Sequence, residues 1–459
     1  MIVNQQEATQ LLEKYNVAGP RYTSYPPVPF WDQKAPNQED WKGLLGQSFA
    51  KYGKEGISLY IHLPYCESLC TYCGCNTRIT VNHAVEEPYI TGVLREWDLY
   101  CEALGEKPVL RELHLGGGTP TFFSPENLQK LVRGILRTVK IHPDLAMSLE
   151  AHPANTSLDH LRILYALGFR RLSLGIQDFD TKVQGLINRH QTFAEVIEVV
   201  DVARRIGFES INLDLLYGLP AQTEESLKAT INKALLLVPD RVAFYGYAHA
   251  PWMKPAQRSF EEHLPSPEAR QSLYVAGKLM FRDAGYVEIG MDHFALPEDQ
   301  LAIAAEQGEL HRNFMGYTTE PTRMLIGLGV SSISDVWQGF AQNVKAVEPY
   351  LERVHRGELP IYRGHQHTEE DLIIRQHILN LMCHYETTWL QGLEGAEMEA
   401  ISEAFPRLEG LQADGLVEWD SKGIRVLPKG RPYVRNVCMA LDARLYRAKP
   451  QTQLFSKTV

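Results

Sequence analysis

The sequence predicts an α/β fold: a partial, TIM-like (β/α)6 barrel with an N-terminal extension and a mainly helical C-terminal domain. Three observations lead to this fold class. From Ile57 to about Met291, short β-type runs alternate with amphipathic stretches, as in successive βα units. Polar residues of chemical interest recur after successive runs, and beyond Tyr362 the pattern becomes helical.

Six runs are predicted as strands, and amphipathic stretches separate them. Ser124-Pro125 and Ser266-Pro267 mark helix starts, because each places a capping serine before a proline at the first helical position. No reversal of strand order is signalled, which favours a barrel over a doubly wound sheet. The predicted strands are Ser58 to His62, Glu112 to Leu115, Ala146 to Glu150, Arg171 to Gly175, Ser210 to Leu215 and Val242 to Tyr247.

The carboxyl ends of barrel strands converge on one face, and the chemically notable residues fall there. A cysteine loop follows the first strand, and Gly116 to Thr119 follow the second. Glu150 closes the third strand. Gln177, Asp214 and Ala248 stand at the ends of the fourth, fifth and sixth strands. The sequence therefore predicts one composite site at this end of the barrel.

Composition divides the chain into three expected domains. Residues 1–50 are polar and proline-punctuated, and they are expected to cover the site at the barrel mouth. Residues 51–361 form the part-barrel. Residues 362–459 form a helical domain, which starts near a capping-box-like Thr368 to Asp371 and contains a winged-helix-like hairpin between Leu416 and Leu427.

Charge and hydropathy exclude two classes of partner. The net charge of -10 opposes a broad phosphate-binding surface, so nucleic acid is not expected as a partner. The longest apolar stretches are far shorter than the roughly 20 residues that span a bilayer, so no membrane association is expected. Met1 to Glu7 lacks the basic and apolar regions of an export signal, which predicts a cytoplasmic protein.

Clustered cysteines are the strongest chemical signal in the chain. Four of the seven fall within ten residues: Cys66, Cys70, Cys73 and Cys75. In a chain without an export signal, clustered thiols indicate a metal site rather than disulfides. The other three lie in apolar helical stretches and are expected to be buried small hydrophobes: Cys101, Cys383 and Cys438.

The CxxxCxxC spacing lets Cys66, Cys70 and Cys73 reach three irons of a [4Fe-4S] cluster, leaving the fourth iron open. The amino and carboxylate groups of S-adenosylmethionine (SAM) can chelate that iron, and one electron then yields methionine and a 5′-deoxyadenosyl radical. A zinc site on all four cysteines is the alternative, although zinc ribbons usually bring two separated CxxC pairs. Cys75 has no obligatory place in a three-ligand cluster, so its role stays open.

Ten segments together resemble the oxygen-independent coproporphyrinogen III oxidase family of radical SAM enzymes, from about residue 15 to the C-terminus. A haem chaperone and an anaerobic haem-degrading enzyme share the CxxxCxxC loop, but Cys75 and the segment His311 to Thr319 favour the oxidase. His152 departs from the acidic residue expected there. The segments are Gly19–Pro26, Tyr60–Cys66, Cys70, Cys73–Cys75, Gly116–Thr121, Gly175–Phe179, Asn188–Arg189, Leu213–Pro220, Met291–Phe294 and His311–Thr319.

The resemblance implies two bound SAM molecules. The positions matching the cluster-bound SAM are Tyr60, Gly117, Glu150 and Ile333. Those matching the second SAM are Tyr72, Gly118, Thr119, Gln177, Arg189, Asp214 and Ala248. The catalytic candidates are Tyr60, His62, Cys75, Glu150 and Arg189. His62 lies two residues beyond Tyr60, so both side chains should point to the same side of the sheet, where His62 has either a structural role or a role beside the cluster.

The resemblance also implies the reaction, an oxidation in haem and porphyrin biosynthesis. The radical would take a hydrogen atom from the β-carbon of a propionate of coproporphyrinogen III. Loss of carbon dioxide and of one electron would leave a vinyl group, and a second round would give protoporphyrinogen IX. A low-potential donor such as flavodoxin or ferredoxin and a monomeric enzyme are expected, with Arg21 and Arg312 as candidate partners of the substrate carboxylates. The alternatives are a haem-binding chaperone or an anaerobic haem-modifying relative on the same fold, and a zinc-stabilised interaction protein.

Overall fold

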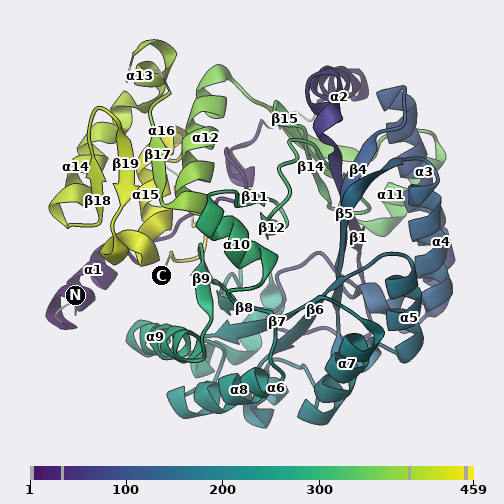
Figure 1. Cartoon of the computed structure of the whole chain (residues 1–459), viewed down its shortest axis with the longest axis horizontal. Coiled ribbons are helices and arrows are strands. Elements are labelled where there is room, and N and C mark those ends of the chain that lie inside the picture. Colours follow the sequence, from purple (N-terminus) through teal and green to yellow (C-terminus); the bar gives the residue numbers. More distant parts are fainter. Residues whose placement is uncertain (1–4, 33–35, 391–393, 449–452, 459) are drawn as a thin grey trace.

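The computed structural model describes residues 5–32, 36–390, 394–448 and 453–458. The sequence predicts that Met1 to Glu7 is not an export signal. Residues 1–4 of this segment lie outside the described range. In the described part, no helix is long and apolar enough to cross a membrane. The centre of the molecule is a large curved sheet with helices along its outer side (Figure 1).

Six parallel strands form the middle of this sheet, and they confirm the predicted part-barrel. Each predicted strand lies in an observed one, apart from Tyr247, which follows the end of β8. Their neighbours in the sheet follow the order in the chain, as a barrel of βα units requires. The strands are β1 (Ile57–Leu63), β4 (Val109–Gly117), β5 (Lys140–Ala151), β6 (Arg171–Gln177), β7 (Ser210–Tyr217) and β8 (Arg241–Gly246).

The crossover helices start where the sequence places caps. Ser124 Oγ accepts a hydrogen bond from Asn127 N–H at 3.3 Å, and Ser266 Oγ accepts one from Ala269 N–H at 3.2 Å. These caps confirm the predicted starts. The helices are α3 (Glu86–Leu104), α4 (Pro125–Leu136), α5 (Leu158–Ala166), α6 (Thr181–Leu186), α7 (Phe193–Ile206), α8 (Glu224–Leu236) and α9 (Pro267–Asp283).

The sheet extends beyond the six predicted strands at both edges, to twelve strands in all. β13 pairs in parallel with β1 and is followed by three antiparallel strands, while β10 and β9 continue antiparallel beyond β8. The expected domain limit at residue 361 falls at the start of the last of these, so the domain division stays a prediction. The added strands are β9 (Val287–Ile289), β10 (His293–Ala295), β13 (Leu325–Leu328), β14 (Ile333–Asp335), β15 (Gly339–Asn343) and β16 (Ile361–Gln366).

The C-terminal part is mainly helical, with a small three-stranded sheet. The capping box at Thr368 and the hairpin of β18 and β19 are both confirmed, and β17 joins the hairpin. The elements are α12 (Glu369–His384), β17 (Glu386–Thr388), α13 (Gly395–Ile401), α14 (Phe405–Ala413), β18 (Val417–Trp419), β19 (Gly423–Val426), α15 (Val434–Leu441) and α16 (Ala443–Ala448). Further elements are α10 (Gln300–Gln307), the hairpin of β11 (His311–Asn313) and β12 (Gly316–Thr318), and α11 (Val347–His355), which packs against α3.

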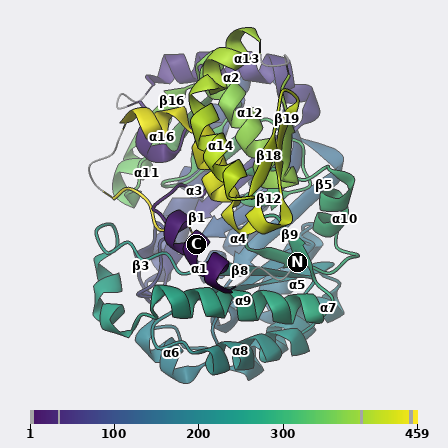
Figure 2. The same cartoon turned by 90° about the vertical axis from the view of Figure 1, so that its left-hand side faces the viewer.

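The N-terminal segment packs with the C-terminal part. Leu11, Tyr15, Tyr22 and Tyr25 belong to the same buried cluster as the side chains of α12 and α15. Gly19 N–H donates to Ser456 O at 3.1 Å, and Figure 2 shows α1 (Gln5–Tyr15) beside the C-terminal end. α2 (Gln38–Tyr52) lies farther away, against α3.

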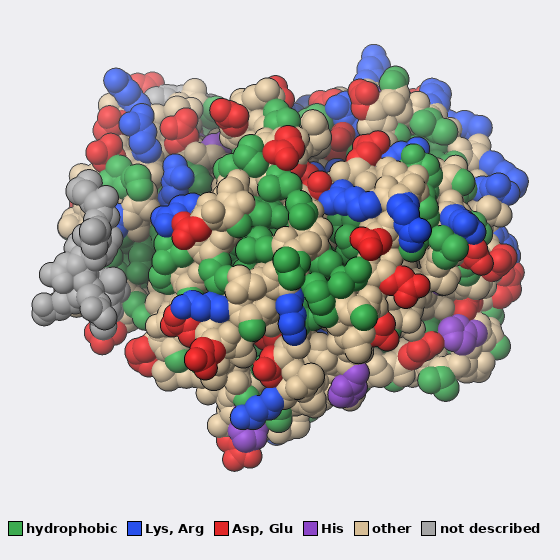
Figure 3. All heavy atoms as spheres, turned by 60° about the horizontal axis from the view of Figure 1, so that its bottom comes forward, with side chains coloured by type: hydrophobic (Ala, Val, Ile, Leu, Met, Phe, Trp, Pro, Cys, Tyr) green, Lys and Arg blue, Asp and Glu red, His purple; other side chains and the backbone are tan. Residues whose placement is uncertain are grey.

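On the face shown in Figure 3, charged side chains of both signs are interspersed around a central area of apolar side chains. Basic side chains on that face are not gathered into one broad area, as expected for a chain with a net charge of -10.

Candidate active site

The cysteine loop leaves the end of β1 and is closed by a short parallel pair, β2 (Tyr65–Cys66) with β3 (Arg78–Ile79). Arg78 N–H donates to Pro64 O at 2.8 Å, and Cys73 N–H donates to Cys70 O at 3.0 Å. These bonds fold the loop back on itself at the carboxyl end of the barrel.

Polar groups surround the three predicted ligand thiols. Thr119 Oγ1 lies 3.3 Å from Cys66 Sγ, and Arg189 Nη1 donates to Cys70 Sγ at 3.7 Å. Burial raises the pKa of the Cys66 thiol to about 11. A hydrogen bond from the Cys75 thiol is the main cause that lowers the pKa of Cys73 to about 6, although burial opposes it.

These residues fit an iron–sulfur cluster, because donors and a positive charge face sulfur atoms that must become thiolates. Among the described residues, no three His, Cys, Asp or Glu side chains are grouped closely enough to surround a single metal ion. A cubane cluster places each thiolate on a different iron, so its ligands need not approach one another that closely.

Two glycines shape the end of β4 where it meets the cysteine loop. Gly117 has φ +119°, which favours glycine. A Cβ on Gly118 would lie 2.6 Å from Pro64 O and 3.0 Å from Cys66 Sγ, while Gly118 N–H donates to Leu63 O at 2.9 Å. The backbone at Gly118 therefore contacts the loop at a distance that no side chain permits.

Tyr60 and His62 point to the same side of β1, as predicted. Tyr60 O–H lies 3.1 Å from His62 Nδ1, and His62 Nε2 lies 2.8 Å from Asn76 O. Since the carbonyl accepts from Nε2–H, Nδ1 is left to accept from Tyr60. His62 is buried and linked to the cysteine loop, and burial lowers its pKa. His62 is therefore a neutral imidazole that carries its proton on Nε2.

Glu150 closes β5 and faces the glycine turn. Gly117 N–H donates to Glu150 Oε2 at 3.1 Å, and His114 Nε2 lies 3.4 Å from Oε1. Burial raises the pKa of Glu150, but the interactions with His114 and with the Gly117 N–H lower it by more. The net pKa of Glu150 therefore lies below the usual value. Glu150 is therefore a carboxylate at neutral pH.

These side chains line one cavity of about 240 Å³ together with Ile333 at the start of β14. The structure thus brings together Tyr60, Glu150 and Ile333, three positions that were expected to contact the same SAM. His114 also lines this cavity.

Arg189 is 7% exposed and lies beside the ends of β6 and the cysteine loop. Its Nη2 donates to Gly175 O and its Nε donates to Gln191 Oε1 at 3.2 Å. Gln177 follows at the end of β6 with φ +67°. Together with the bond to Cys70, these contacts hold the guanidinium between the end of β6 and the cysteine loop.

Asp214 lies on β7 inside the barrel. Asn212 Nδ2 donates to its Oδ1 at 2.7 Å, and Ser173 Oγ donates to its Oδ2 at 3.3 Å. Burial and the nearby charge of Glu150 raise the pKa of Asp214 to about 7, against these hydrogen bonds. Asp214 and Glu150 line a second cavity of about 240 Å³ in the barrel interior.

Tyr72 and Ala248 are connected through one amide. Gln257 Nε2 donates to Tyr72 O at 3.0 Å and to Ala248 O at 3.3 Å, which links the cysteine loop to the segment after β8. Cys75 is exposed beside this connection, and Lys254 Nζ donates to its carbonyl at 2.6 Å.

Sequence reasoning missed His114, whose ring stacks on Tyr60 with centroids 5.9 Å apart. The sequence does contain a signal for His114. This histidine precedes Gly116 by two residues, and strand alternation puts both residues on the same face of the sheet. His152, the departure from the expected acidic residue, accepts from Ala154 N–H at 3.2 Å. Burial and the charge of Arg189 lower its pKa to about 3, so His152 is neutral.

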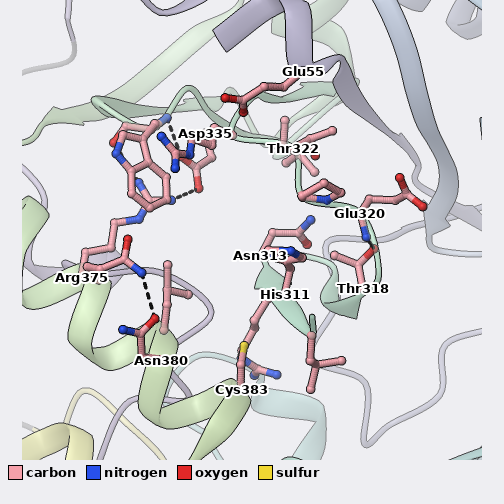
Figure 4. Close-up of a pocket in the computed structure, with 18 of the residues that line it drawn as sticks. Glu55, His311, Asn313, Thr318, Glu320, Thr322, Asp335, Arg375, Asn380 and Cys383 are labelled. Carbon is pink, nitrogen blue, oxygen red and sulfur yellow. Dashed lines mark hydrogen bonds and ion pairs between the residues drawn. The ribbon is translucent and has the colours of Figure 1, made fainter. Parts of the chain in front are cut away.

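A larger cavity of about 460 Å³ lies at the opposite, amino end of β1 and β13 (Figure 4). The β11–β12 hairpin and α12 form its walls, and Arg375 Nη2 donates to Asp335 Oδ2 at 2.5 Å on one side of it. Thr318 borders both this cavity and the barrel interior, so the hairpin separates the two spaces.

Known proteins resemble the whole chain. Residues 60–234 match the model of the radical SAM superfamily. Oxygen-independent coproporphyrinogen III oxidases of Synechocystis sp. and Salmonella typhimurium are 36% and 39% identical, each over 98% of both chains. The solved structure of coproporphyrinogen III oxidase from Escherichia coli, described as a radical SAM enzyme, superposes with a TM-score of 0.87 at 36% identity and covers 92% of this chain and 97% of its own.

Proposed function

The chain belongs to the oxygen-independent coproporphyrinogen III oxidases of the radical SAM superfamily, and we propose that the strand-end residues described above are its catalytic centre. It is an oxidoreductase of haem biosynthesis that acts through radical SAM chemistry with a [4Fe-4S] cluster and SAM. The observation that supports the assignment is the convergence of Tyr60, Glu150 and Ile333 on one cavity beside the cysteine loop.

We assign the cluster to the thiolates of Cys66, Cys70 and Cys73. With SAM bound, the cluster would supply the one-electron chemistry for taking a hydrogen atom from a propionate of coproporphyrinogen III. Arg189 and Thr119 would stabilise two of the thiolates, and His62 would hold the loop through Asn76. Gly117 and Gly118 would let the backbone approach SAM.

Glu150 and Tyr60 would orient the cluster-bound SAM. Glu150 is ionised and can accept hydrogen bonds from the ammonium group of SAM, while Tyr60 and His114 form a stacked wall of the same cavity. Cys75, exposed at the edge of the loop, is assigned to the substrate side of the site.

A second SAM would lie beside the first. Gln177, Arg189 and Asp214 support this assignment, because they lie on or just after the neighbouring strands β6 and β7 and supply an amide, a cation and an acid. Tyr72, Gly118, Thr119 and Ala248 complete the proposed set.

Equilibrium binding of SAM to the anaerobically reconstituted enzyme tests this proposal. Two molecules per chain are expected for the wild type, and Asp214→Asn should retain its iron but bind only one. Asp201→Asn, on the outer helix α7, should still bind two. One SAM per wild-type chain would overturn the second site and leave the family chemistry intact.

We further propose a cytoplasmic monomer that takes electrons from a low-potential donor such as flavodoxin or ferredoxin. The clustered thiols support a reducing compartment, because they must stay free to hold the cluster. Size measurement under anaerobic conditions tests the monomer, and a mass of twice 52.1 kDa would contradict it.

A further inference from the structure

We propose that Arg21, Arg270 and Arg312 bind the non-reacting propionate carboxylates of the substrate at the mouth of the barrel. This inference rests on the proposed function, since it concerns the substrate of the same site. The three guanidinium groups approach from the N-terminal segment, from α9 and from the β11–β12 hairpin. They meet near the ends of β7 and β8, around Asp292.

Arg21 lies over the barrel interior. Its Nη2 donates to Gly246 O at 3.1 Å, at the end of β8, and its Nη1 lies 3.4 Å from Asp292 Oδ2. The guanidinium carbon is 5.9 Å from the ring centroid of Tyr245. Tyr245 lines the interior cavity together with Asp214 and Glu150, so Arg21 stands beside the proposed reaction site.

Arg312 lies on the β11–β12 hairpin, where it lines the cavity of about 460 Å³ on one side and packs over a tyrosine of the barrel interior on the other. Its guanidinium carbon is 4.4 Å from the ring centroid of Tyr317, which also lines the interior. Its Nε and Nη2 approach the carbonyls of Tyr22 and Arg21 at 3.4 Å each. Its Nη1 is buried without a hydrogen-bond partner in the described part of the chain. A buried cationic donor left without an acceptor is costly, and an anionic ligand would satisfy it.

Arg270 completes the group from α9. It packs against Gly218 and Gly246, where a Cβ would meet its side chain at 3.2 Å and 2.6 Å. Its guanidinium carbon is 5.8 Å from the ring centroid of Tyr217. Its Nε is also buried without a partner among the described residues. The two glycines thus admit a cation to the strand ends.

Positive charge exceeds negative charge at this place. Asp292 experiences the charges of Arg21, Arg435, Arg312 and Arg270, which oppose the rise in its pKa caused by burial. Burial and the charge of Arg21 lower the pKa of Arg435 to about 9. Among the described residues, these four arginines form a single ion pair, that of Arg21 with Asp292. A polyanion would balance the remaining charge.

The substrate has the matching chemistry. It carries four propionates, and guanidinium groups bind carboxylates through paired hydrogen bonds. An ion pair stabilises a carboxylate against loss as neutral carbon dioxide, so these arginines should hold the propionates that are not reacting. The reacting propionate would then point toward Glu150 and the cluster.

Binding of coproporphyrin III, the stable oxidised macrocycle, to the cluster-loaded enzyme tests the site by fluorescence anisotropy. Arg270→Gln and Arg312→Gln should each weaken binding about tenfold, as loss of a charged hydrogen bond predicts. Binding of the uncharged tetramethyl ester should change little. Arg282→Gln, on the same helix as Arg270 but exposed and paired with Asp283, is the matched control and should bind both compounds like the wild type.

Asp292→Asn should change the affinity for coproporphyrin III in the opposite direction, because it removes the carboxylate that competes with the ligand for the arginines. It should strengthen binding of the acid severalfold. Equal loss of acid and ester binding in the arginine variants, or no loss at all, would overturn the inference. The binding assay does not depend on turnover. If binding depends on these arginines but the wild type releases no carbon dioxide, the binding site is upheld and the proposed function is refuted.

Discussion

Gly118 decides whether the cysteine loop can lie against the end of β4. Its missing side chain leaves the space in which Pro64 O and Cys66 Sγ approach the backbone. At this scale the sequence predicted that these positions would lie together, because strand ends of a barrel converge by geometry. Contacts between side chains, such as Arg189 with Cys70, depend on rotamers and packing that no spacing specifies.

Gly118→Ala should lower cluster content severalfold, because the added Cβ would displace Cys66. Iron and sulfide per chain after anaerobic reconstitution measure the effect. Gly74→Ala, in the same loop, has no heavy atom within 4 Å of its added Cβ and should load normally. Equal iron in both variants would show that the close approach is not required.

At the scale of elements, α3 fixes the loop that precedes β14. Glu96 on α3 is fully buried and accepts hydrogen bonds from Gly329 N–H at 2.8 Å, Asn343 Nδ2 at 2.6 Å and Tyr350 O–H at 2.6 Å. Ile333 follows this loop. The six parallel strands were predictable from repeated βα patterns, whereas β9 and β14 have three residues each, too few for a periodic signal.

Glu96 should make stability depend on pH. Burial raises its pKa from 4.5 to about 7, against these hydrogen bonds, so the folded state favours the protonated form. Its stabilising contribution is full below pH 4.5 and is lost as pH rises to 7, by up to roughly 3 kcal/mol. Chemical denaturation between pH 5 and 8 should show this loss in the wild type and a flatter profile in Glu96→Gln. Parallel profiles would contradict the assignment.

For the whole molecule, the two chain ends meet at one buried arginine. Arg435 donates to the carbonyls of Pro20 at 2.9 Å, Lys457 at 3.2 Å and Thr458 at 3.0 Å, and also to that of Gly19. Composition predicted that the N-terminal extension would cover the site. It could not predict this junction, because contacts between residues more than 400 positions apart leave no local pattern.

Arg435→Gln should loosen the N-terminal segment, since several buried carbonyls would lose their donor. Limited proteolysis with thermolysin should cut this segment about ten times faster than in the wild type. Arg431→Gln, whose guanidinium lies 4.8 Å from the ring centroid of Tyr385, is the control and should be cut at the wild-type rate. Unchanged cleavage in Arg435→Gln would contradict the anchoring role.

The central claim is that this strand-end site decarboxylates coproporphyrinogen III. An anaerobic assay of the reconstituted enzyme with SAM, dithionite and coproporphyrinogen III, read by mass spectrometry, tests it most directly. The wild type should form 5′-deoxyadenosine and a tetrapyrrole that has lost two carboxyl groups, and Cys70→Ala should form neither product. Cleavage of SAM while the porphyrinogen stays unchanged would contradict it.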